Sequence, residues 1–309
     1  MEEMIRTEEL TKVYDGRTIL DRVSLKVNQG EIYGFLGLNG AGKTTTIRML
    51  LGMIKPTSGQ VYLHGRRLTP GGDLWNQVGY MVEVPYAYPD LTVRENLILY
   101  AQMRGIRRAR NAVNEAVDQL SLSAYIDTKV KNLSLGNAQK LGIAKAVIHQ
   151  PGILILDEPI NALDPAGIVA IRELLKSLAD KGVTVFISSH ILEEMSKLAS
   201  RIGIIHQGVL LQEISVREFE DLRAKKLYLG VRGNPELAKQ KLIEAGFHAK
   251  VSAEQILELS NPGAVQRPEL INQIMAKAGI PVYLLRVEEE ELESYFLHMV
   301  GSDLAKELK

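Results

Sequence analysis

A glycine-rich stretch with a lysine and adjoining threonines carries the residue types that bind phosphate. Residues 37–44 read Gly-Leu-Asn-Gly-Ala-Gly-Lys-Thr, and Thr45 follows. This is the spacing of the phosphate-binding loop: Gly, four variable residues, Gly, Lys, and Ser or Thr. The glycines let consecutive backbone N–H groups surround phosphate oxygens. Lys43 is expected to reach the β- and γ-phosphates of a nucleoside triphosphate, and Thr44 to offer its hydroxyl to Mg²⁺.

A pair of acids follows a long aliphatic run. Residues 152–156 read Gly-Ile-Leu-Ile-Leu, and Asp157 and Glu158 come next. Such a run is typical of a central parallel strand, which ends at the carboxyl edge of its sheet. Asp157 would there hold Mg²⁺, directly or through water, and Glu158 would polarise a water for attack on the γ-phosphate. The alternative is that both acids merely end the strand in solvent; the phosphate-binding loop argues against it.

The segments around these motifs predict an α/β fold. Residues 31–36 predict a buried strand before the glycine loop, and residues 45–51 predict a helix after it, which is the context that the loop requires. His190 ends another aliphatic strand, expected at 183–187, and should reach the same sheet edge. A lone histidine there is more often a hydrogen-bonding residue than a catalytic one. Further strands are expected at 4–10, 19–27, 60–64 and 78–82 and as a hairpin over 202–212, and helices at 92–105, 109–120 and from 165 to Gly182.

Composition narrows the class of protein. The 309 residues are 46% hydrophobic and 24% charged, as in an ordinary globular protein. Lys plus Arg and Asp plus Glu both number 37, so charge gives no bulk reason to expect nucleic acid as a partner. The absence of cysteine excludes disulfides and thiolate metal sites. No apolar run approaches the roughly 18 residues of a membrane span, and the acidic N-terminus lacks a signal-peptide core, so a cytoplasmic location is expected.

Residues 133–137, Leu-Ser-Leu-Gly-Asn, decide among the folds that carry a phosphate-binding loop. They resemble the signature sequence of ATP-binding cassette (ABC) transporters, usually Leu-Ser-Gly-Gly-Gln, and they open a helix shortly before the acidic strand. With the other motifs in order, the chain resembles an ABC nucleotide-binding subunit over residues 4–220. This resemblance implies an α/β P-loop NTPase cassette over 1–222: a mixed sheet with helices, an antiparallel β subdomain, and a helical subdomain at about 90–150.

The resemblance also implies roles for individual residues. Tyr14 would stack on adenine, although its residue type alone favours packing on the sheet edge. Asp157 would support Mg²⁺, Glu158 would be the catalytic base, and His190 would contact the γ-phosphate. The phosphates would be wrapped by Asn39, Gly40, Ala41, Gly42, Lys43, Thr44 and Thr45. Across a head-to-tail dimer, the partner's nucleotide would meet Ser134, Gly136 and Asn137, and Asp164 would belong to the loop that communicates between subunits.

Three positions depart from the family pattern. Leu135 replaces the usual Gly and Asn137 the usual Gln, while Ser134 and Gly136, the phosphate contacts, are kept. Glu83 stands where most cassettes have a Gln that approaches Mg²⁺ and the attacking water, so it adds negative charge near the phosphates. The Glu-x-Pro loop that it starts resembles cassettes of the bacitracin- and lantibiotic-export type.

The implied function is an ATPase subunit that powers export of a drug or antimicrobial peptide by a separate membrane permease. It would work as an ATP-dependent homodimer, or as a heterodimer with another cassette, on the inner face of the cell membrane. The alternative is a soluble ABC-type ATPase acting on DNA or the ribosome, but the single cassette, the short helical insertion and the zero net charge disfavour it. A kinase or GTPase is disfavoured by the signature and by the adjacent acids.

The chain beyond the cassette, residues 223–309, predicts a small accessory domain. Strands are expected at 226–232, 247–252, 255–260 and 281–287, with helices from Pro235 to Gly246 and from Pro268 to Gly279. This β-α-β-β-α-β order suggests a ferredoxin-like α+β domain. A last helix is expected around residues 291–299 and resembles the closing helix of export-type cassettes. The sequence gives this domain no chemistry.

Overall fold

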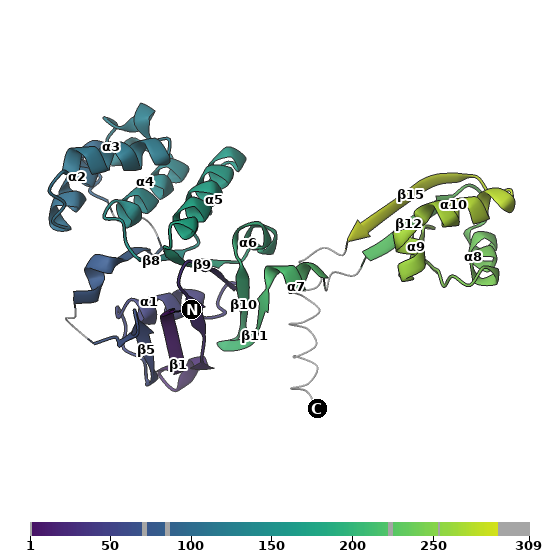
Figure 1. Ribbon diagram of the computed structural model, residues 1–309, viewed down its shortest axis with the longest axis horizontal. Coiled ribbons are helices and arrows are strands. Elements are labelled where there is room, and N and C mark those ends of the chain that lie inside the picture. Colours follow the sequence, from purple (N-terminus) through teal and green to yellow (C-terminus); the bar gives the residue numbers. More distant parts are fainter. Residues whose placement is uncertain (1, 70–72, 84–86, 222–224, 253, 290–309) are drawn as a thin grey trace. The chain divides into compact units, whose positions relative to one another are not determined.

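The computed structural model describes residues 2–69, 73–83, 87–221, 225–252 and 254–289 (Figure 1). The chain divides into two compact units, Met1–Arg217 and Glu218–Lys309. The domain boundary expected between 222 and 223 falls outside the described residues. None of the described helices has the length and the run of apolar residues that crossing a bilayer requires.

A six-stranded sheet forms the centre of the first unit. Its strand order is β11-β10-β4-β9-β8-β7, with five parallel strands and β11 antiparallel at one edge. The aliphatic runs expected to be buried strands are buried throughout in β4, β8 and β9. The strands are β4 (Ile32–Leu36), β7 (Val78–Met81), β8 (Ile153–Asp157), β9 (Thr184–Ser189), β10 (Arg201–His206) and β11 (Val209–Ser215).

Helices and a second sheet cover the two faces of this central sheet. Side chains alternate along β4, so Tyr33 and Phe35 face a core shared with α1 (Lys43–Leu50) and the second sheet, while a β-carbon on Gly34 would touch α6 (Leu192–Leu198). Figure 1 shows α5 (Pro165–Asp180) on one side of β8 and β9 and the second sheet on the other. The central sheet is therefore buried between layers.

The second sheet is antiparallel. It has the order β2-β1-β5-β6, with β3 also pairing with β1. One strand was expected over 19–27, but the structure has two, separated at Ser24 and Leu25. The hydroxyl of Thr7 donates to Val23 O and accepts from Leu25 N, so it replaces the ladder bonds at this point. The strands are β1 (Glu3–Tyr14), β2 (Arg17–Val23), β3 (Lys26–Asn28), β5 (Ser58–Leu63) and β6 (Arg66–Arg67).

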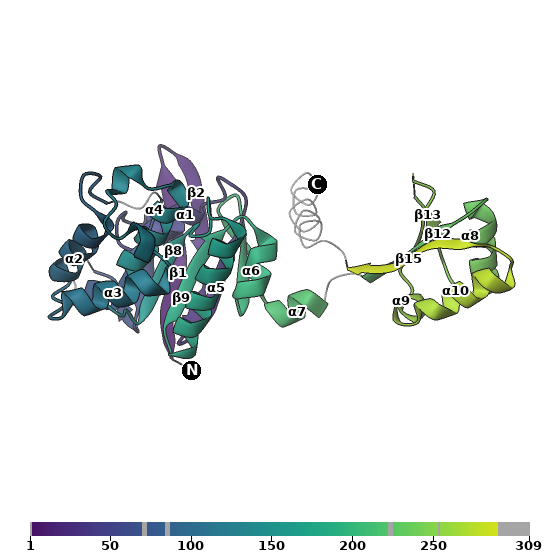
Figure 2. The same ribbon diagram turned by 90° about the horizontal axis from the view of Figure 1, so that it is seen from above.

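Three helices form the predicted helical subdomain and lie together at one end of the first unit (Figure 2). They are α2 (Val93–Met103), α3 (Ala109–Gln119) and α4 (Leu135–Val147). Thr92 caps α2 as expected, in a capping box with Glu95. Helix α4 approaches β7 so closely that a β-carbon on Gly79 would lie 2.0 Å from Ala146 O. Short 3₁₀ helices occupy Asp73–Gln77, Ser123–Tyr125 and Val130–Asn132.

The second unit has the element order expected from the sequence, with an additional short helix, α9. Its four strands form an antiparallel sheet in the order β13-β14-β12-β15, packed on its own apolar cluster. The ferredoxin-like class stays a prediction, and the helix expected around residues 291–299 falls outside the described residues. The elements are β12 (Lys225–Val231), α8 (Pro235–Glu244), β13 (Lys250–Val251), β14 (Leu257–Leu259), α9 (Pro262–Gln266), α10 (Pro268–Lys277) and β15 (Val282–Glu289); α7 (Val216–Asp221) spans the division between the units.

Candidate active site

The glycine loop joins the end of β4 to the first residue of α1. Gly40 and Gly42 have φ angles of 83° and 107°, a region that favours glycine. A β-carbon on Gly37 would lie 2.5 Å from Ile205 O, so this glycine lets β10 approach the loop. The loop therefore places exposed Asn39 and Gly40 directly before the N-terminus of a helix, where backbone N–H groups favour an anion.

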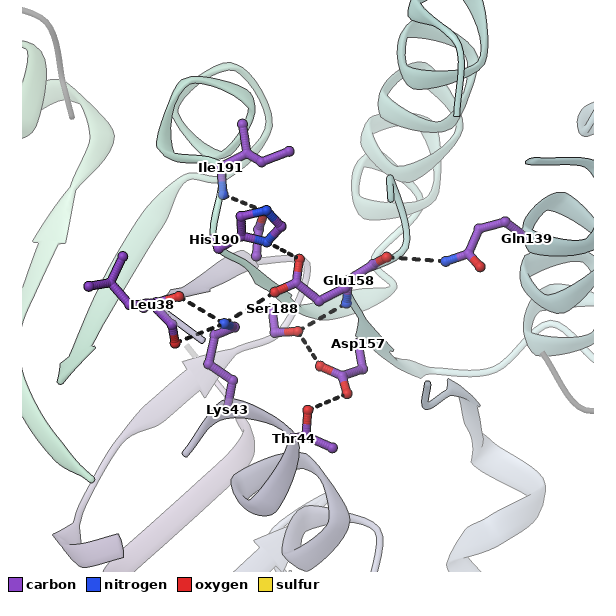
Figure 3. Close-up of polar contacts among 11 residues, drawn as sticks. Leu38, Lys43, Thr44, Gln139, Asp157, Glu158, Ser188, His190 and Ile191 are labelled. Atoms are coloured by element: carbon purple, nitrogen blue, oxygen red, sulfur yellow. Dashed lines mark hydrogen bonds and ion pairs between the residues drawn. The ribbon is translucent and has the colours of Figure 1, made fainter. Parts of the chain in front are cut away.

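Lys43 lies under the loop, and its side chain is only 5% exposed. Its Nζ donates hydrogen bonds to Gly37 O at 2.8 Å and Leu38 O at 3.4 Å (Figure 3). The same nitrogen lies 3.1 Å from Oε1 of Glu158. A buried ammonium is thus held by two carbonyls and one carboxylate, at the place where the sequence predicts the β- and γ-phosphates.

Asp157 is tied to two hydroxyl groups from different elements. Thr44 Oγ1 donates to Oδ2 of Asp157 at 2.8 Å, and Ser188 Oγ donates to Oδ1 at 2.5 Å (Figure 3). Asp157 is 3% exposed, so these bonds compensate the cost of burying a carboxylate. The Thr44 hydroxyl and the Asp157 carboxylate offer the oxygen ligands that Mg²⁺ prefers.

The described residues contain no group of three or more His, Asp or Glu side chains that could hold a metal by themselves. Mg²⁺ is usually bound in phosphate sites by one or two protein groups, with waters and substrate phosphates completing the shell. The Thr44–Asp157 pair is suited to that arrangement.

Glu158 stands between a cation and a histidine. While Oε1 faces Lys43, Oε2 lies 3.0 Å from Nδ1 of His190. Its side chain is 20% exposed, and that of His190 is 40% exposed. Two neighbours thus fix the carboxylate (Figure 3), which is still partly exposed to solvent.

The register of the central sheet explains why these residues meet. Asp157 pairs with Ser188, and Leu36 pairs with Ser189, so β4, β8 and β9 end at the same edge. A hydrogen bond from Gly37 N to Ser189 O, 3.3 Å long, joins the loop to β9. The sequence prediction that the loop, both acids and His190 meet at one edge agrees with this geometry.

The signature residues lie at the N-terminus of α4. Ser134 is the N-cap, and its hydroxyl accepts a 3.3 Å hydrogen bond from Asn137 N. A β-carbon on Gly136 would lie 2.9 Å from Ala162 O, so glycine lets the helix pack on the chain that follows β8. Leu135 is 61% exposed. Lys43, Thr44, Asp157, Glu158 and His190 are here called the Lys43 cluster. No hydrogen bond within the described residues joins Ser134 to this cluster.

Comparisons with known proteins show the family to which the chain belongs. The family model described as "ABC transporter" matches residues 20–161. The bacitracin transport ATP-binding protein BcrA of Bacillus licheniformis is 41% identical over 307 residues, covering 97% of this chain and 98% of that protein. The chain belongs to the ATP-binding proteins of ABC transporters.

Two further ABC proteins resemble the chain over a smaller part of its length. The lantibiotic transport ATP-binding protein SrtF of Streptococcus pyogenes is 38% identical over 210 residues, 68% of this chain and 90% of that protein. A solved dimeric structure of the cassette MJ0796 in a post-hydrolysis state, bound to ADP and Pi, has a TM-score of 0.65 and 26% identity, covering 69% of this chain and 99% of that one. The chain is thus an ABC ATPase.

Three predicted residues of the ABC site make no hydrogen bond or ion pair with the Lys43 cluster within the described residues. Tyr14 is 44% exposed, with Lys12 Nζ 4.5 Å from the centre of its ring. Glu83 is ion-paired with Arg48 of α1. Asp164 caps α5 by accepting a 2.9 Å hydrogen bond from Gly167 N, which gives it a local structural role besides the predicted one.

Two residues that touch the acids were not predicted from the sequence. Ser188 bonds to Asp157 and accepts a 3.0 Å hydrogen bond from Glu158 N, while Gln139 of α4 donates through Nε2 to Glu158 O at 3.1 Å. Only one feature of the sequence could have indicated Ser188 as a site residue: it ends a strand that lies beside the acidic strand. No such feature indicated Gln139, because nothing local relates a glutamine in a helix to a peptide 19 residues away.

Proposed function

We propose that this ABC ATPase powers the export of a peptide antibiotic of the bacitracin class through a separate membrane permease. The observation that supports this specificity is the likeness to BcrA, which extends over 97% of the chain. The likeness to the lantibiotic protein SrtF covers 68%. Since BcrA matches nearly the full length, the resemblance includes the second unit as well as the cassette. We propose that the chain acts at the cytoplasmic face of the membrane, through the permease.

We assign each residue of the cluster a part in hydrolysis, supported by its contacts. Asn39 to Thr45 surround the phosphates of ATP, and Lys43 neutralises charge on the β- and γ-phosphates. Glu158 accepts a proton from the attacking water, and His190 orients its carboxylate and reaches the γ-phosphate. Thr44 and Asp157 would hold Mg²⁺. When bound, the ion would supply positive charge to offset the negative charge that develops on the phosphates.

The signature residues support a head-to-tail dimer. Ser134 is exposed at the N-terminus of α4, where free backbone N–H groups suit an anion such as the nucleotide of a partner subunit. Gly136 and Asn137 belong to the same turn. The MJ0796 cassette was solved as a dimer. We propose that two cassettes, identical or different, close around two ATP molecules and reopen after hydrolysis.

The residues at the periphery receive the roles implied by the family. Tyr14, whose ring centre lies 4.5 Å from Lys12 Nζ, stacks on adenine. Asp164 transmits changes across the dimer. Glu83 follows the permease and turns from Arg48 toward the metal when the subunits close. Against the alternative of a soluble ATPase acting on DNA or the ribosome, the relatives with named activities are transport proteins.

Replacing Glu158 by Gln tests the chemistry. Glu158→Gln removes the base and keeps the side-chain shape, so it should lower kcat about 100-fold or more and leave ATP binding intact. Lys43→Ala should instead weaken ATP binding about 10-fold or more through loss of a charged contact. If Glu158→Gln turns over ATP at the wild-type rate, Glu158 is not the base.

Two further measurements test assembly and export. By light scattering, Glu158→Gln should be a dimer with ATP–Mg²⁺ and a monomer without them; a monomer in both conditions contradicts ATP-driven closure of the isolated chain.

Cells that lack the chain should regain bacitracin tolerance with the wild type and not with Glu158→Gln. Equal tolerance with both proteins contradicts ATP-powered export.

A further inference from the structure

The peptide of Glu158 is held in an unfavourable conformation by side chains from two elements. Glu158 has a φ of 48°, a left-handed value that non-glycine residues rarely adopt. Ser188 Oγ of β9 accepts a 3.0 Å hydrogen bond from its N–H. Its carbonyl accepts from Asn161 N at 3.2 Å and from Gln139 Nε2 at 3.1 Å. Such a conformation persists only where its surroundings impose it.

Gln139 is a buried polar side chain with a specific target. It lies on α4, five residues after Ser134, and is only 6% exposed among the apolar residues of the helix. A buried amide without a hydrogen bond is costly, whereas an apolar residue would fill the same space at no such cost. The bond to Glu158 O compensates the amide and leads directly to the acid of the cluster (Figure 3).

We infer that Gln139 is a positioning residue for ATP hydrolysis: it fixes the peptide of Glu158 and so ties the signature helix to the catalytic carboxylate. The inference rests on the proposed role of Glu158 as the base. The backbone turn at Glu158 decides where its side chain points, and both carboxylate oxygens are already engaged, by Lys43 and His190. A small rotation of this peptide moves the carboxylate away from the water that it must deprotonate.

The same bond gives a route between two nucleotides. In the proposed dimer, the N-terminus of α4 binds the partner's ATP through Ser134, while Gln139 on the same helix holds the base of its own subunit. Gly136 of the same helix also packs closely on the chain after β8, since a β-carbon there would lie 2.9 Å from Ala162 O. Gln139 therefore connects the helix that is proposed to meet the partner's nucleotide with the peptide of Glu158 in its own subunit.

Gln139→Met tests the inference, because Met has a similar length and no donor. We expect kcat to fall about 10-fold or more with KM for ATP within about twofold, since Asn161 still bonds the carbonyl. Gln119→Met, at the exposed end of α3, is the matched control and should keep the wild-type rate. Thermal unfolding should give similar midpoints for both variants. An unchanged kcat in Gln139→Met overturns the inference.

A second variant separates positioning from damage to the signature. In the Glu158→Gln background, Gln139→Met should leave the ATP concentration for half-maximal dimerisation unchanged, because Ser134 and the helix N-terminus are intact. If this concentration rises by the same factor as kcat falls, Gln139 acts through the signature and the inference is wrong. If Glu158→Gln alone keeps the wild-type rate, the proposed role of Glu158 as the base is wrong. This outcome is distinct from a failure of the inference on Gln139.

Discussion

The hydroxyl of Ser188 donates a 2.5 Å hydrogen bond to Oδ1 of Asp157, from the neighbouring strand of the central sheet. The two residues are direct partners in the parallel ladder of β8 and β9, and both are almost fully buried. Because the same oxygen accepts from Glu158 N, one hydroxyl fixes a carboxylate and the next peptide together. Asp157, the proposed metal ligand, and Glu158, the proposed base, are therefore both held by the hydroxyl of Ser188.

Ser188→Ala should remove this support. Asp157 loses a hydrogen bond and the buried N–H of Glu158 loses its partner, which should cost about 1 to 3 kcal/mol of unfolding free energy. We expect kcat to fall about 10-fold or more because both acids lose orientation. Urea unfolding and steady-state ATPase assays measure these effects. Ser196→Ala, at an exposed hydroxyl bonded to Glu193 O, is the control. A Ser188→Ala protein with wild-type stability and rate would contradict the argument.

Gly79 allows the signature helix to reach the sheet. A β-carbon there would lie 2.0 Å from Ala146 O and 2.8 Å from a side-chain carbon of Pro151, and the backbone of α4 cannot yield cheaply. Gly79→Ala should therefore cost about 3 kcal/mol or more, measured by urea unfolding. Gly105→Ala is the control: its φ is +68° but its β-carbon would meet nothing within 4 Å, so it should cost about 1 kcal/mol. Equal losses of unfolding free energy in the two variants would contradict the argument that the close contact with α4 makes Gly79 necessary.

The central site could be predicted from the sequence because its signals are local. The spacing of residues 37–44 fixes a loop before a helix, and aliphatic runs ending in Asp157 and at residues 188–190 mark parallel strands. Parallel strands end at one sheet edge, so chain segments more than 100 residues apart can be brought together without knowing any contact.

Contacts that depend on packing could not be predicted. Gln139 lies in a helix where a polar residue normally faces solvent, and only the approach of α4 to the chain after β8 buries it. Thr7 divides the expected strand 19–27 because its hydroxyl bonds across to Val23 and Leu25. Helix α6, which packs on β4, was not expected, since its seven residues are too short for a clear period.

His149 makes stability depend on pH. Its Nε2 lies 3.2 Å from Val78 O, and its Nδ1 is buried without a hydrogen-bond partner among the described residues. Burial, with the charge of Arg104, lowers the pKa of His149 from 6.5 to about 4, although the bond to Val78 O opposes this. Between pH 6.5 and about 4, His149 is protonated in the unfolded chain but stays neutral in the folded chain. The free energy of unfolding therefore decreases as pH falls from 6.5 toward 4.

His149→Gln isolates this effect, because glutamine keeps a donor near Val78 O and does not titrate. We expect wild type to lose about 1 to 2 kcal/mol more than the variant between about pH 7.5 and pH 5, after allowing for partial solvent screening. Urea unfolding at the two pH values measures the difference. Burial also lowers the pKa of His64, so only the comparison with the variant is informative. Parallel losses in both proteins would contradict the assignment.

The pairing of Thr44 with Asp157 predicts how the enzyme depends on Mg²⁺. Thr44 Oγ1 and Asp157 Oδ2 are 2.8 Å apart. These two oxygens are too few to hold the ion without ATP phosphates and water as further ligands. Chelation should therefore stop hydrolysis, and added Mg²⁺ should restore it. Thr44→Val removes one ligand and should raise the Mg²⁺ concentration for half-maximal rate about 10-fold, whereas Thr69→Val, exposed outside the site, should leave it unchanged. If Thr44→Val lowers kcat without shifting the Mg²⁺ midpoint, its hydroxyl serves only to orient Asp157.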